Sequence, residues 1–369
     1  MVRILHIGLS ANIGGIESFL INLYRSIDRK QVQFDFIAYD NCKALENEIL
    51  HMGGKVFNVS CKKIYYFSKT LRNIMLVNNY DIVHIHKNSW ANIVPLLVCK
   101  SVGITNIVWH SHNTKPSIKN VFYISLLHYI NKKLFSSLVD YKLACSKVAA
   151  EWMFGKNLSD VVLINNGIEV KKFEFNISIR NSMRSSMGIS EDTLVLGSVG
   201  RISEQKNQKF LLDLVKELKS LRKCKLILCG DGELRKNLEN YAYRIGISND
   251  VIFTGARNDV NILLNVMDVF LLPSLWEGLP VVCVEAQANG LPCIVSSAVS
   301  DEANITKSFH KIENYDLDCW IKTIFSNENR NKNAVKEIVQ SGYDIRHSLR
   351  KLMEIYIYNK YSDSTKKEG

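Results

Sequence analysis

The chain has 369 residues, of which 47% are hydrophobic and 22% are charged. This composition is typical of a globular protein with a buried core, and the length favours two domains of roughly 100–200 residues each. No uncharged apolar run reaches the roughly 18 residues of a transmembrane helix. The N-terminal stretch lacks the shape of a signal peptide, so a cytoplasmic protein is expected. Nine scattered cysteines without a C-x-x-C pair argue against a zinc ribbon.

Positive charge is concentrated in the first half of the chain. The formal net charge is +11, and residues 1–165 contain 19 Lys and Arg against 10 Asp and Glu. The basic residues gather mainly in residues 49–80 and 115–147. A basic face attracts anionic partners, which here would be nucleic acid or an anionic membrane.

Short apolar runs alternate with helical patterns, as in parallel βα units. Strands are expected in the first half at residues 4–8, 34–38, 55–59, 81–86, 106–112, 141–145 and 161–164, and in the second half at residues 194–200, 225–230, 251–254, 269–273 and 292–296. The runs are apolar throughout rather than alternating, which indicates strands covered by helices on both faces. Helical patterns include residues 16–26 and 207–221, and residues 343–361 form a late amphipathic pattern.

The turn signal Asn165-Asn166-Gly167 is followed by a polar segment, residues 169–192. This segment has the pattern of neither a strand nor a core helix, so we expect the interdomain linker there. The predicted organisation is an N-terminal domain at residues 1–168, a C-terminal domain at 169–342, and a helix with a tail at 343–369. That last helix is expected to pack back on the N-terminal domain.

The strongest chemical signal begins after the strand predicted to end at Pro273. Glu277 and Glu285 lie eight positions apart, separated by a turn that contains Gly278, Leu279 and Pro280. Open α/β sheets bind ligands at the carboxyl ends of their strands. A carboxylate there can accept hydrogen bonds from sugar hydroxyls, and amides at the start of the next helix can hold phosphate.

This segment resembles the Glu–x7–Glu signature of glycosyltransferase family 4, whose members are retaining enzymes with the GT-B fold. The chain is most similar to the bacterial capsule and exopolysaccharide transferases of that family. Similar landmarks are Gly14-Gly15-Ile16-Glu17, Asp81-Ile-Val-His84-Ile-His86, His110-Ser-His112-Asn113, Ala144-Cys-Ser146, Asn166-Gly167-Ile168-Glu169, Gly200-Arg201, Lys206-Asn207, Gly230-Asp231-Gly232 and Phe253-Thr254-Gly255. The resemblance implies an α/β fold of two Rossmann-like domains whose parallel sheets face a central cleft. The acceptor would bind the N-terminal domain and the donor the C-terminal domain.

Each candidate residue has a physical reason beside the resemblance. Arg201 at a strand end and Lys206 near a helix start suit the growing charge of a diphosphate leaving group. The resemblance implies that Glu285 binds the ribose and that Glu277 contacts the donor sugar. His112 most resembles the active-site histidine of the family, although His110 is an alternative and a core histidine is the commoner fate of such a residue.

The candidates fall into three groups. The catalytic candidates are His112, Arg201, Lys206 and Glu277. The donor-binding candidates are Gly14, Gly15, His110, Gly200, Gly230, Gly232, Gly255, Arg257, Gly278, Leu279, Pro280 and Glu285. The acceptor-side candidates are His86 and Glu17. No cofactor and no metal are expected, because the Asp-x-Asp sequence, Asp316-Leu-Asp318, lies in a helical pattern rather than after a strand.

The implied activity is a retaining transfer of sugar from a nucleoside diphosphate sugar, with UDP as the default, to a lipid-linked saccharide in surface polysaccharide biosynthesis. Two alternatives remain open: a sugar-nucleotide epimerase of the same fold, and a basic nucleic-acid-binding protein. A third, a catalytically inactive membrane scaffold, is disfavoured because Arg201, Lys206, Glu277 and Glu285 are all present. Where the family often has a glycine-rich turn, this chain has Ser296-Ser-Ala-Val-Ser300. That departure leaves the recognition of the donor sugar open.

Residues 121–135 are apolar and aromatic with a basic end. Such a helix can lie in a membrane interface, although a core helix is the commoner explanation. With the basic first half, this pattern predicts a peripheral association with an anionic inner-membrane surface.

Overall fold

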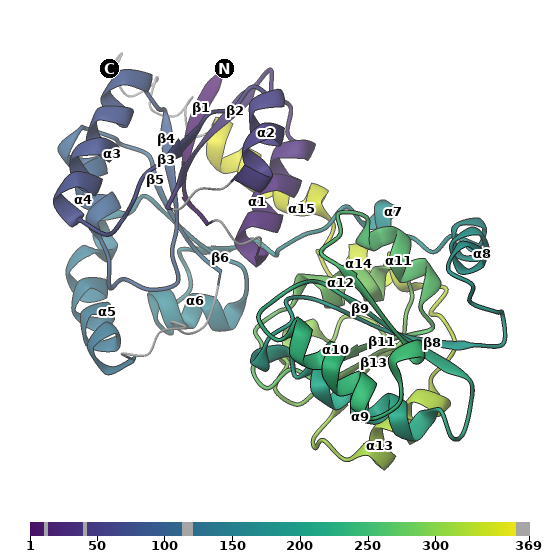
Figure 1. Ribbon diagram of the computed structural model, residues 1–369. Helices are drawn as coiled ribbons and strands as arrows, with labels where there is room; N and C mark the ends of the chain where they lie inside the picture. Colours follow the sequence, from purple (N-terminus) through teal and green to yellow (C-terminus); the bar gives the residue numbers. More distant parts are fainter. Residues whose placement is uncertain (11–13, 40–42, 113–120, 359–369) are drawn as a thin grey trace. The chain divides into compact units, whose positions relative to one another are not determined.

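The computed structural model describes residues 1–10, 14–39, 43–112 and 121–358. The chain forms two compact units (Figure 1). The N-terminal unit contains Met1–Gly167 together with Ile345–Gly369, and the C-terminal unit contains Ile168–Asp344. The chain therefore passes between the units twice, after Gly167 and after Asp344.

The N-terminal unit is built on a seven-stranded sheet with the order β3-β2-β1-β4-β5-β6-β7, and every pairing in it is parallel. The strands are β1 (Val2–Leu9), β2 (Val32–Ala38), β3 (Val56–Asn58), β4 (Ile82–His86), β5 (Ile107–Ser111), β6 (Tyr141–Ala144) and β7 (Val161–Leu163). The helices are α1 (Gly15–Ser26), α2 (Lys43–His51), α3 (Ile64–Asn78), α4 (Val94–Ser101), α5 (Val121–Phe135), η1 (Ser136–Leu138), α6 (Lys147–Phe154) and α15 (Ile345–Met353), which continues as the π-helical turn η5 (Glu354–Tyr358).

The two faces of this sheet are covered by different helices (Figure 1). Side chains alternate between the faces along a strand, so Val83 and Ile85 pack with α3 and α4 in one apolar cluster. Ile4 and Ile82 point to the other face and pack with α1, α2 and α15. Further along the same strands, this second face carries histidines.

The C-terminal helix returns to the N-terminal unit, as expected. Ile345, Leu352, Ile355 and Tyr356 are buried in the same apolar cluster as Ile4. The expected amphipathic helix at 343–361 is thus present as α15 and η5, while residues 359–369 lie outside the described residues.

The C-terminal unit has a six-stranded sheet with the order β10-β9-β8-β11-β12-β13, again with parallel pairings only. The strands are β8 (Leu194–Val199), β9 (Cys224–Cys229), β10 (Val251–Gly255), β11 (Val269–Leu272), β12 (Cys293–Ser296) and β13 (Phe309–Ile312). The helices are α7 (Val170–Phe173), α8 (Ile177–Ser186), η2 (Glu204–Lys206), α9 (Gln208–Leu218), α10 (Arg235–Arg244), η3 (Ser248–Asp250), α11 (Val260–Val266), α12 (Val281–Ala288), η4 (Asp301–Ala303), α13 (Leu317–Ser326) and α14 (Ala334–Gln340).

Every expected strand is present, and the described residues contain one further strand that the sequence patterns did not predict. β13 has four residues, Phe309–Ile312, with polar His310 and Lys311 at its centre. It pairs with β12 alone, at the edge of the sheet. Such a short edge strand lacks the continuous apolar run by which the buried strands were recognised.

The expectation of a linker at residues 169–192 was wrong. This segment forms α7 and α8 and belongs to the C-terminal unit. Val170, Phe173 and Ile189 are buried in the core of that unit. The few apolar side chains of the segment are spaced too widely to predict a core helix, yet tertiary packing buries these three, while Ile177 stays exposed.

For residues 121–135, a core helix was the commoner of the two explanations, but helix α5 is not a core helix. Six large apolar side chains of α5 are exposed, namely Phe122, Tyr123, Leu126, Tyr129, Ile130 and Leu134, and Phe122 is 85% exposed. None of the helices in the described residues is both long and apolar enough to cross a membrane.

Leu352→Ala should test whether α15 is an integral part of the N-terminal unit. Leu352 is fully buried, so its truncation should destabilise that unit by about 2–5 kcal/mol. Arg350 is exposed on the same helix, and Arg350→Ala should change the unfolding midpoint little. Chemical denaturation followed by tryptophan fluorescence measures both variants. Equal midpoints for the two would contradict the packing of α15.

Candidate functional site

In the C-terminal unit, two loops diverge where the strand order reverses. β9 and β10 lie on one side of β8, and β11, β12 and β13 lie on the other. The connections that leave β8 and β11 therefore run in opposite directions, and open α/β sheets bind ligands at such a switch point. Lys206 follows β8 and Glu277 follows β11, so the sheet topology brings these two candidates to the same place.

Lys206 and Glu277 form an ion pair across the switch point. Lys206 Nζ donates to Glu277 Oε2, and the Ser274 hydroxyl lies 3.3 Å from the same oxygen. Both charged side chains are only 14% exposed. A backbone hydrogen bond of 2.8 Å from Leu275 to Gln205 joins their two loops. A cation and a carboxylate 71 residues apart are thus held together before any ligand binds.

Glu285 occupies a different environment on α12. Its side chain is half-buried, and within the described residues no hydrogen-bond donor contacts its carboxylate. Burial raises its pKa to about 7, and the charge of Lys172 opposes this shift. A desolvated carboxylate without a donor is favourably placed to accept hydrogen bonds from ligand hydroxyls.

The turn between the two glutamates leads into the start of α12. Pro280 is the N-cap residue, and it supplies no side-chain cap to the first turn. Helix N-termini attract phosphate through free N–H groups and the helix dipole. The serine-rich segment that departs from the family pattern braces this turn through backbone hydrogen bonds. The N–H of Glu277 donates to Ala298 O at 3.2 Å, and the N–H of Ser300 donates to Gly278 O at 3.3 Å.

Close packing explains two of the candidate glycines. A Cβ atom on Gly230 would lie 1.9 Å from Gly200 O, and one on Gly232 would lie 2.1 Å from Ile202 O. Gly230 also pairs with Gly255 in a backbone bridge. These strand ends are therefore packed backbone against backbone, and contact of Gly200, Gly230, Gly232 and Gly255 with a donor stays a prediction.

Arg201 and Arg257 lie at the surface, each beside a carboxylate. Arg201 pairs with Glu233 at 3.1 Å, and Arg257 pairs with Asp259 at 2.5 Å. The Arg201 side chain is 63% exposed. Exposed ion pairs contribute little to stability, so each guanidinium can turn from its partner to an anionic ligand at small cost.

In the N-terminal unit, Glu17 organises the glycine loop. Its carboxylate accepts hydrogen bonds from Ser10 N at 3.0 Å, from Ser10 Oγ at 2.7 Å and from Gly14 N at 3.0 Å. Glu17 is 5% exposed, so the residue expected to face the acceptor instead braces the loop. A Cβ atom on Gly15 would meet nothing within 4 Å, so close packing is not the reason for a glycine at this position. Residues 11–13 of this loop lie outside the described residues.

Five histidines share one face of the N-terminal sheet. His6 lies on β1, His84 and His86 on β4, His110 on β5, and His112 directly after β5. The strand register places His6 beside His84 and His86 beside His110. Sequence reasoning missed His6, although its even spacing from Val2 and Ile4 puts it on this face.

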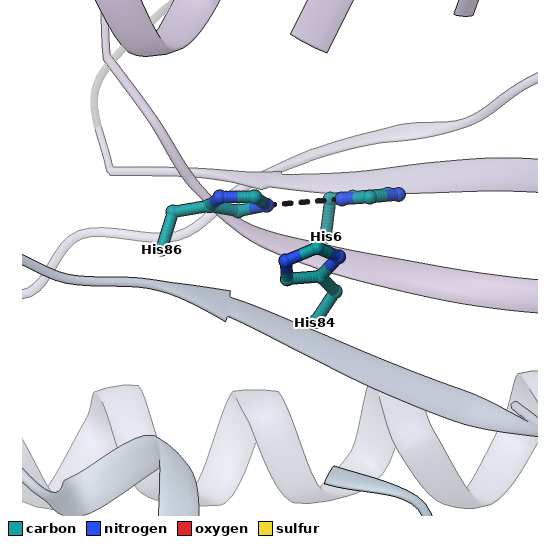
Figure 2. Close-up of side chains that lie close together, drawn as sticks. All are labelled: His6, His84 and His86. Carbon is teal, nitrogen blue, oxygen red and sulfur yellow. Dashed lines mark hydrogen bonds between the residues drawn. The ribbon is translucent and has the colours of Figure 1, made fainter. Parts of the chain in front are cut away.

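These rings are linked by hydrogen bonds. His6 Nδ1 lies 3.0 Å from His86 Nε2 (Figure 2), and His86 Nδ1 lies 2.8 Å from His112 Nε2. His84 bonds to His110 at 3.2 Å and to the Tyr356 hydroxyl at 2.7 Å. Four of these histidines are buried and His112 is half-buried. Desolvation lowers the pKa of every ring, to about 3 for His6 and about 4 for His112. The rings are therefore neutral at pH 7.

The structure distinguishes His112 from His110. His110 is fully buried, packs against Phe19 and bonds to His84, so it has no surface for direct contact with a donor. His86, expected on the acceptor side, is 2% exposed and is likewise enclosed. His112 is half-buried at the strand end. Asn113, which follows it in the resemblance, lies outside the described residues.

The spacing of the histidines would permit a metal ion in two overlapping groups, His6-His84-His86 and His86-His110-His112. Most of these ring nitrogens are engaged in hydrogen bonds instead, although His6 Nε2 and His110 Nε2 have no partner among the described residues. His6 Nδ1 and His86 Nε2 are bonded to each other, and both nitrogens of His84 have partners. A metal ion would have to replace these bonds.

Comparison with known proteins identifies the family. Two family models match, Glycosyltransferase Family 4 over residues 13–172 and Glycosyl transferases group 1 over residues 179–333. The chain is 32% identical over 370 residues to EpsF of Bacillus subtilis, which is named as a glycosyltransferase, with 96% of each chain covered. The chain belongs to glycosyltransferase family 4.

Other family relatives span nearly the whole chain. A UDP-Gal:alpha-D-GlcNAc-diphosphoundecaprenol alpha-1,3-galactosyltransferase of Escherichia coli is 25% identical, with 96% of this chain and 97% of the relative covered. The capsular polysaccharide biosynthesis glycosyltransferase CapH of Staphylococcus aureus is 23% identical, with 97% and 99% covered. This membership identifies the chain as a glycosyltransferase and does not favour the epimerase or the nucleic-acid-binding alternative.

Solved structures agree on the GT-B fold. Anabaena HepE in complex with UDP has a TM-score of 0.76 at 18% identity, with 96% of this chain and 99% of HepE covered. Sucrose-phosphate synthase of Thermosynechococcus elongatus has a TM-score of 0.78 at 14% identity, with 98% and 100% covered. In this family 4 chain, the parallel sheets of the two units are the Rossmann-like halves of that fold.

Glu285→Gln should stabilise the free protein at alkaline pH and leave it unchanged in acid. Burial raises the pKa of Glu285 above its unfolded value. The wild-type carboxyl therefore costs nothing below its unfolded pKa of 4.5. Its cost grows between pH 4.5 and about 7 and stays at up to about 3 kcal/mol above that. Denaturation of wild type and variant at pH 4.5 and pH 8 measures the difference. Asp318→Asn, at an exposed carboxyl, is the control, and a pH-independent effect of Glu285→Gln would contradict the buried charge.

Proposed function

We propose that this family 4 enzyme transfers a sugar from a nucleoside diphosphate sugar, with UDP as the nucleotide, to a lipid-linked saccharide in surface polysaccharide biosynthesis. The transfer retains the anomeric configuration and uses no metal ion. The observation that carries the proposal is the Lys206–Glu277 pair at the switch point, with the carboxylate of Glu285 on the helix that follows, to which no described residue donates a hydrogen bond.

The donor would be held by groups of matching chemistry. Glu285 would accept hydrogen bonds from the ribose hydroxyls. No described residue donates a hydrogen bond to this desolvated carboxylate. Lys206 and Arg201 would contact the diphosphate, and Glu277 would accept from the sugar hydroxyls. The UDP and UDP-glucose complexes of HepE support a nucleotide-sugar donor.

The chemical step would depend on positioning and charge. The bond from the anomeric carbon to the diphosphate oxygen breaks, and the acceptor hydroxyl attacks from the same face. The departing phosphate takes the hydroxyl proton, so the new glycosidic bond forms with retention. Negative charge grows on the diphosphate as this happens, and Lys206 would stabilise it most strongly at that moment. A cation already fixed by its loop needs no metal to perform this role.

To reach a lipid-linked acceptor, the enzyme must approach a membrane. Helix α5 presents an exposed apolar and basic surface that could bind there. Its exposed Phe122, Leu126, Tyr129 and Ile130 lie at helical spacing, and its last turn contains Lys133. Aromatic and basic side chains on one helix suit an anionic bilayer interface. The name of the Escherichia coli relative, which includes a diphosphoundecaprenol acceptor, supports the same class of substrate.

Lys206→Ala should lower kcat by about 10²–10³ and change KM much less, because the cation acts mainly on the transition state. Lys209→Ala removes an exposed lysine of the neighbouring helix α9 and should leave both constants unchanged. Steady-state assays with a panel of UDP-sugars in EDTA measure the variants, and NMR of the product gives its anomeric configuration. A pure KM effect would remove Lys206 from leaving-group stabilisation, and activity that returns only with added magnesium would contradict metal independence.

Phe122→Ser with Lys133→Glu should release the enzyme from anionic vesicles. Wild type should sediment with phosphatidylglycerol vesicles and not with phosphatidylcholine vesicles, and added salt should weaken the binding. Leu221→Ser with Lys223→Glu changes an exposed pair of similar chemistry in the other unit and serves as the control. Equal sedimentation of both variants, or equal binding to both lipids, would contradict docking through α5.

A further inference from the structure

Three of the five histidines form a continuous chain that ends on an amide, here called the histidine relay. His6 Nδ1 contacts His86 Nε2 at 3.0 Å, and His86 Nδ1 contacts His112 Nε2 at 2.8 Å. His112 Nδ1 contacts Asn166 Oδ1 at 3.4 Å. Figure 2 shows the first of these contacts, with the His6 and His86 rings meeting edge to edge.

The amide at the end of the relay determines where every proton lies. An amide oxygen can only accept, so His112 must carry its proton on Nδ1. A neutral imidazole has one N–H group, so His112 Nε2 accepts from His86 Nδ1. By the same rule, His86 Nε2 accepts from His6 Nδ1. His6 Nε2 is then an acceptor, and it has no partner among the described residues.

The opposite arrangement of donors and acceptors along the relay is less favourable. If the Asn166 amide group donated instead, each ring would carry its proton on Nε2. The buried Nε2–H group of His6 would then have no acceptor. Buried donors without partners are rarer than unpartnered acceptors, so the polarity that starts from the Asn166 oxygen is favoured.

Among the described residues, the groups around the relay are neutral. His84 and His110 are neutral neighbours that bond to each other, and the Tyr356 hydroxyl bonds to His84. Burial raises the pKa of Tyr356 well above its usual range, so it remains a phenol. The remaining ring contacts are apolar, with Phe34 against His6 and Phe19 against His112.

We propose that Asn166, His86 and His6 are positioning residues that hold His112 in the neutral Nδ1–H tautomer with its ring fixed at the strand end. Both ring nitrogens of His112 are then engaged. His112 therefore cannot take a proton without losing its bond to His86, and it would present a fixed, uncharged ring edge to a ligand. The kinetic part of this inference rests on the proposed function, whereas the tautomer itself does not.

The tautomer is testable on the full chain by NMR of 15N-labelled histidine. Imidazole free in water prefers the Nε2–H tautomer, so three rings in the Nδ1–H form would be diagnostic. His6, His86 and His112 should each show the neutral Nδ1–H pattern between pH 6 and pH 8. Single His→Gln variants assign the signals, and His310→Gln, in the other unit, is the control. An Nε2–H pattern or a charged ring at His112 would overturn the proposal.

Variants at Asn166 separate positioning from folding. Asn166→Leu removes the acceptor and should mix the His112 tautomers and lower kcat about tenfold, the effect of roughly one hydrogen bond. Asn166→Asp keeps an acceptor oxygen, so it should restore the Nδ1–H pattern and most of kcat. Its negative charge raises the pKa of His112, so the acid limb of the pH profile should move to higher pH. Unchanged spectra and kcat in Asn166→Leu would overturn the proposal.

Two further outcomes are distinguishable. If zinc chloride alone shifts the signals of His6, His84 and His86 and raises the melting temperature, the cluster is a metal site and the relay is wrong. If no nucleotide sugar is turned over, the proposed function fails, and the tautomer spectra still decide the relay.

Discussion

Both halves of this enzyme depend on the parallel arrangement of their strands. Every strand pairing in each sheet is parallel, so all carboxyl ends of a sheet emerge at the same edge. Where the strand order reverses, the two connections leave in opposite directions, and no crossover helix fills the space between them. β8 and β11 define this point in one unit, and β1 and β4 define it in the other. The side chains with the clearest chemistry follow or end these strands.

The two units keep polar side chains out of water in different ways. In the C-terminal unit, the charge of Lys206 is balanced by Glu277, and both stay partly accessible. In the N-terminal unit, desolvation removes charge altogether, since burial lowers the pKa of every clustered histidine. A charged pair can respond to a charged ligand, whereas neutral rings in a fixed tautomer provide shape and hydrogen-bond direction. Under the proposed function, the charged pair would serve the diphosphate and the neutral rings would serve the saccharide.

Buried arginines explain why α8 belongs to the C-terminal unit rather than to a linker. Arg180 and Arg184 both pair with Asp268, and Arg184 is 4% exposed. Arg330 donates to the carbonyl groups of Leu264 and Asn265 near the end of α11, and burial lowers its pKa to about 9. Removing one member of such a network leaves buried charge unpaired, which is strongly destabilising. Two of the polar residues that suggested a linker, Arg180 and Arg184, therefore anchor α8 to the C-terminal unit.

The sequence alone determined the class of the protein, because its signals are local. Apolar runs with intervening helical periods predicted every strand except β13, and the Glu277-to-Glu285 spacing placed two carboxylates around one turn. Contacts between distant residues were decided only by the tertiary structure. In the tertiary structure, Lys206 pairs with Glu277, and Glu17 accepts hydrogen bonds from its own loop. His110 is buried, whereas His112 is half-buried. The relay from His6 to Asn166 links four segments of the N-terminal unit. No local pattern encodes it, because hydrogen-bond partners and desolvation depend on which strands the sheet places side by side.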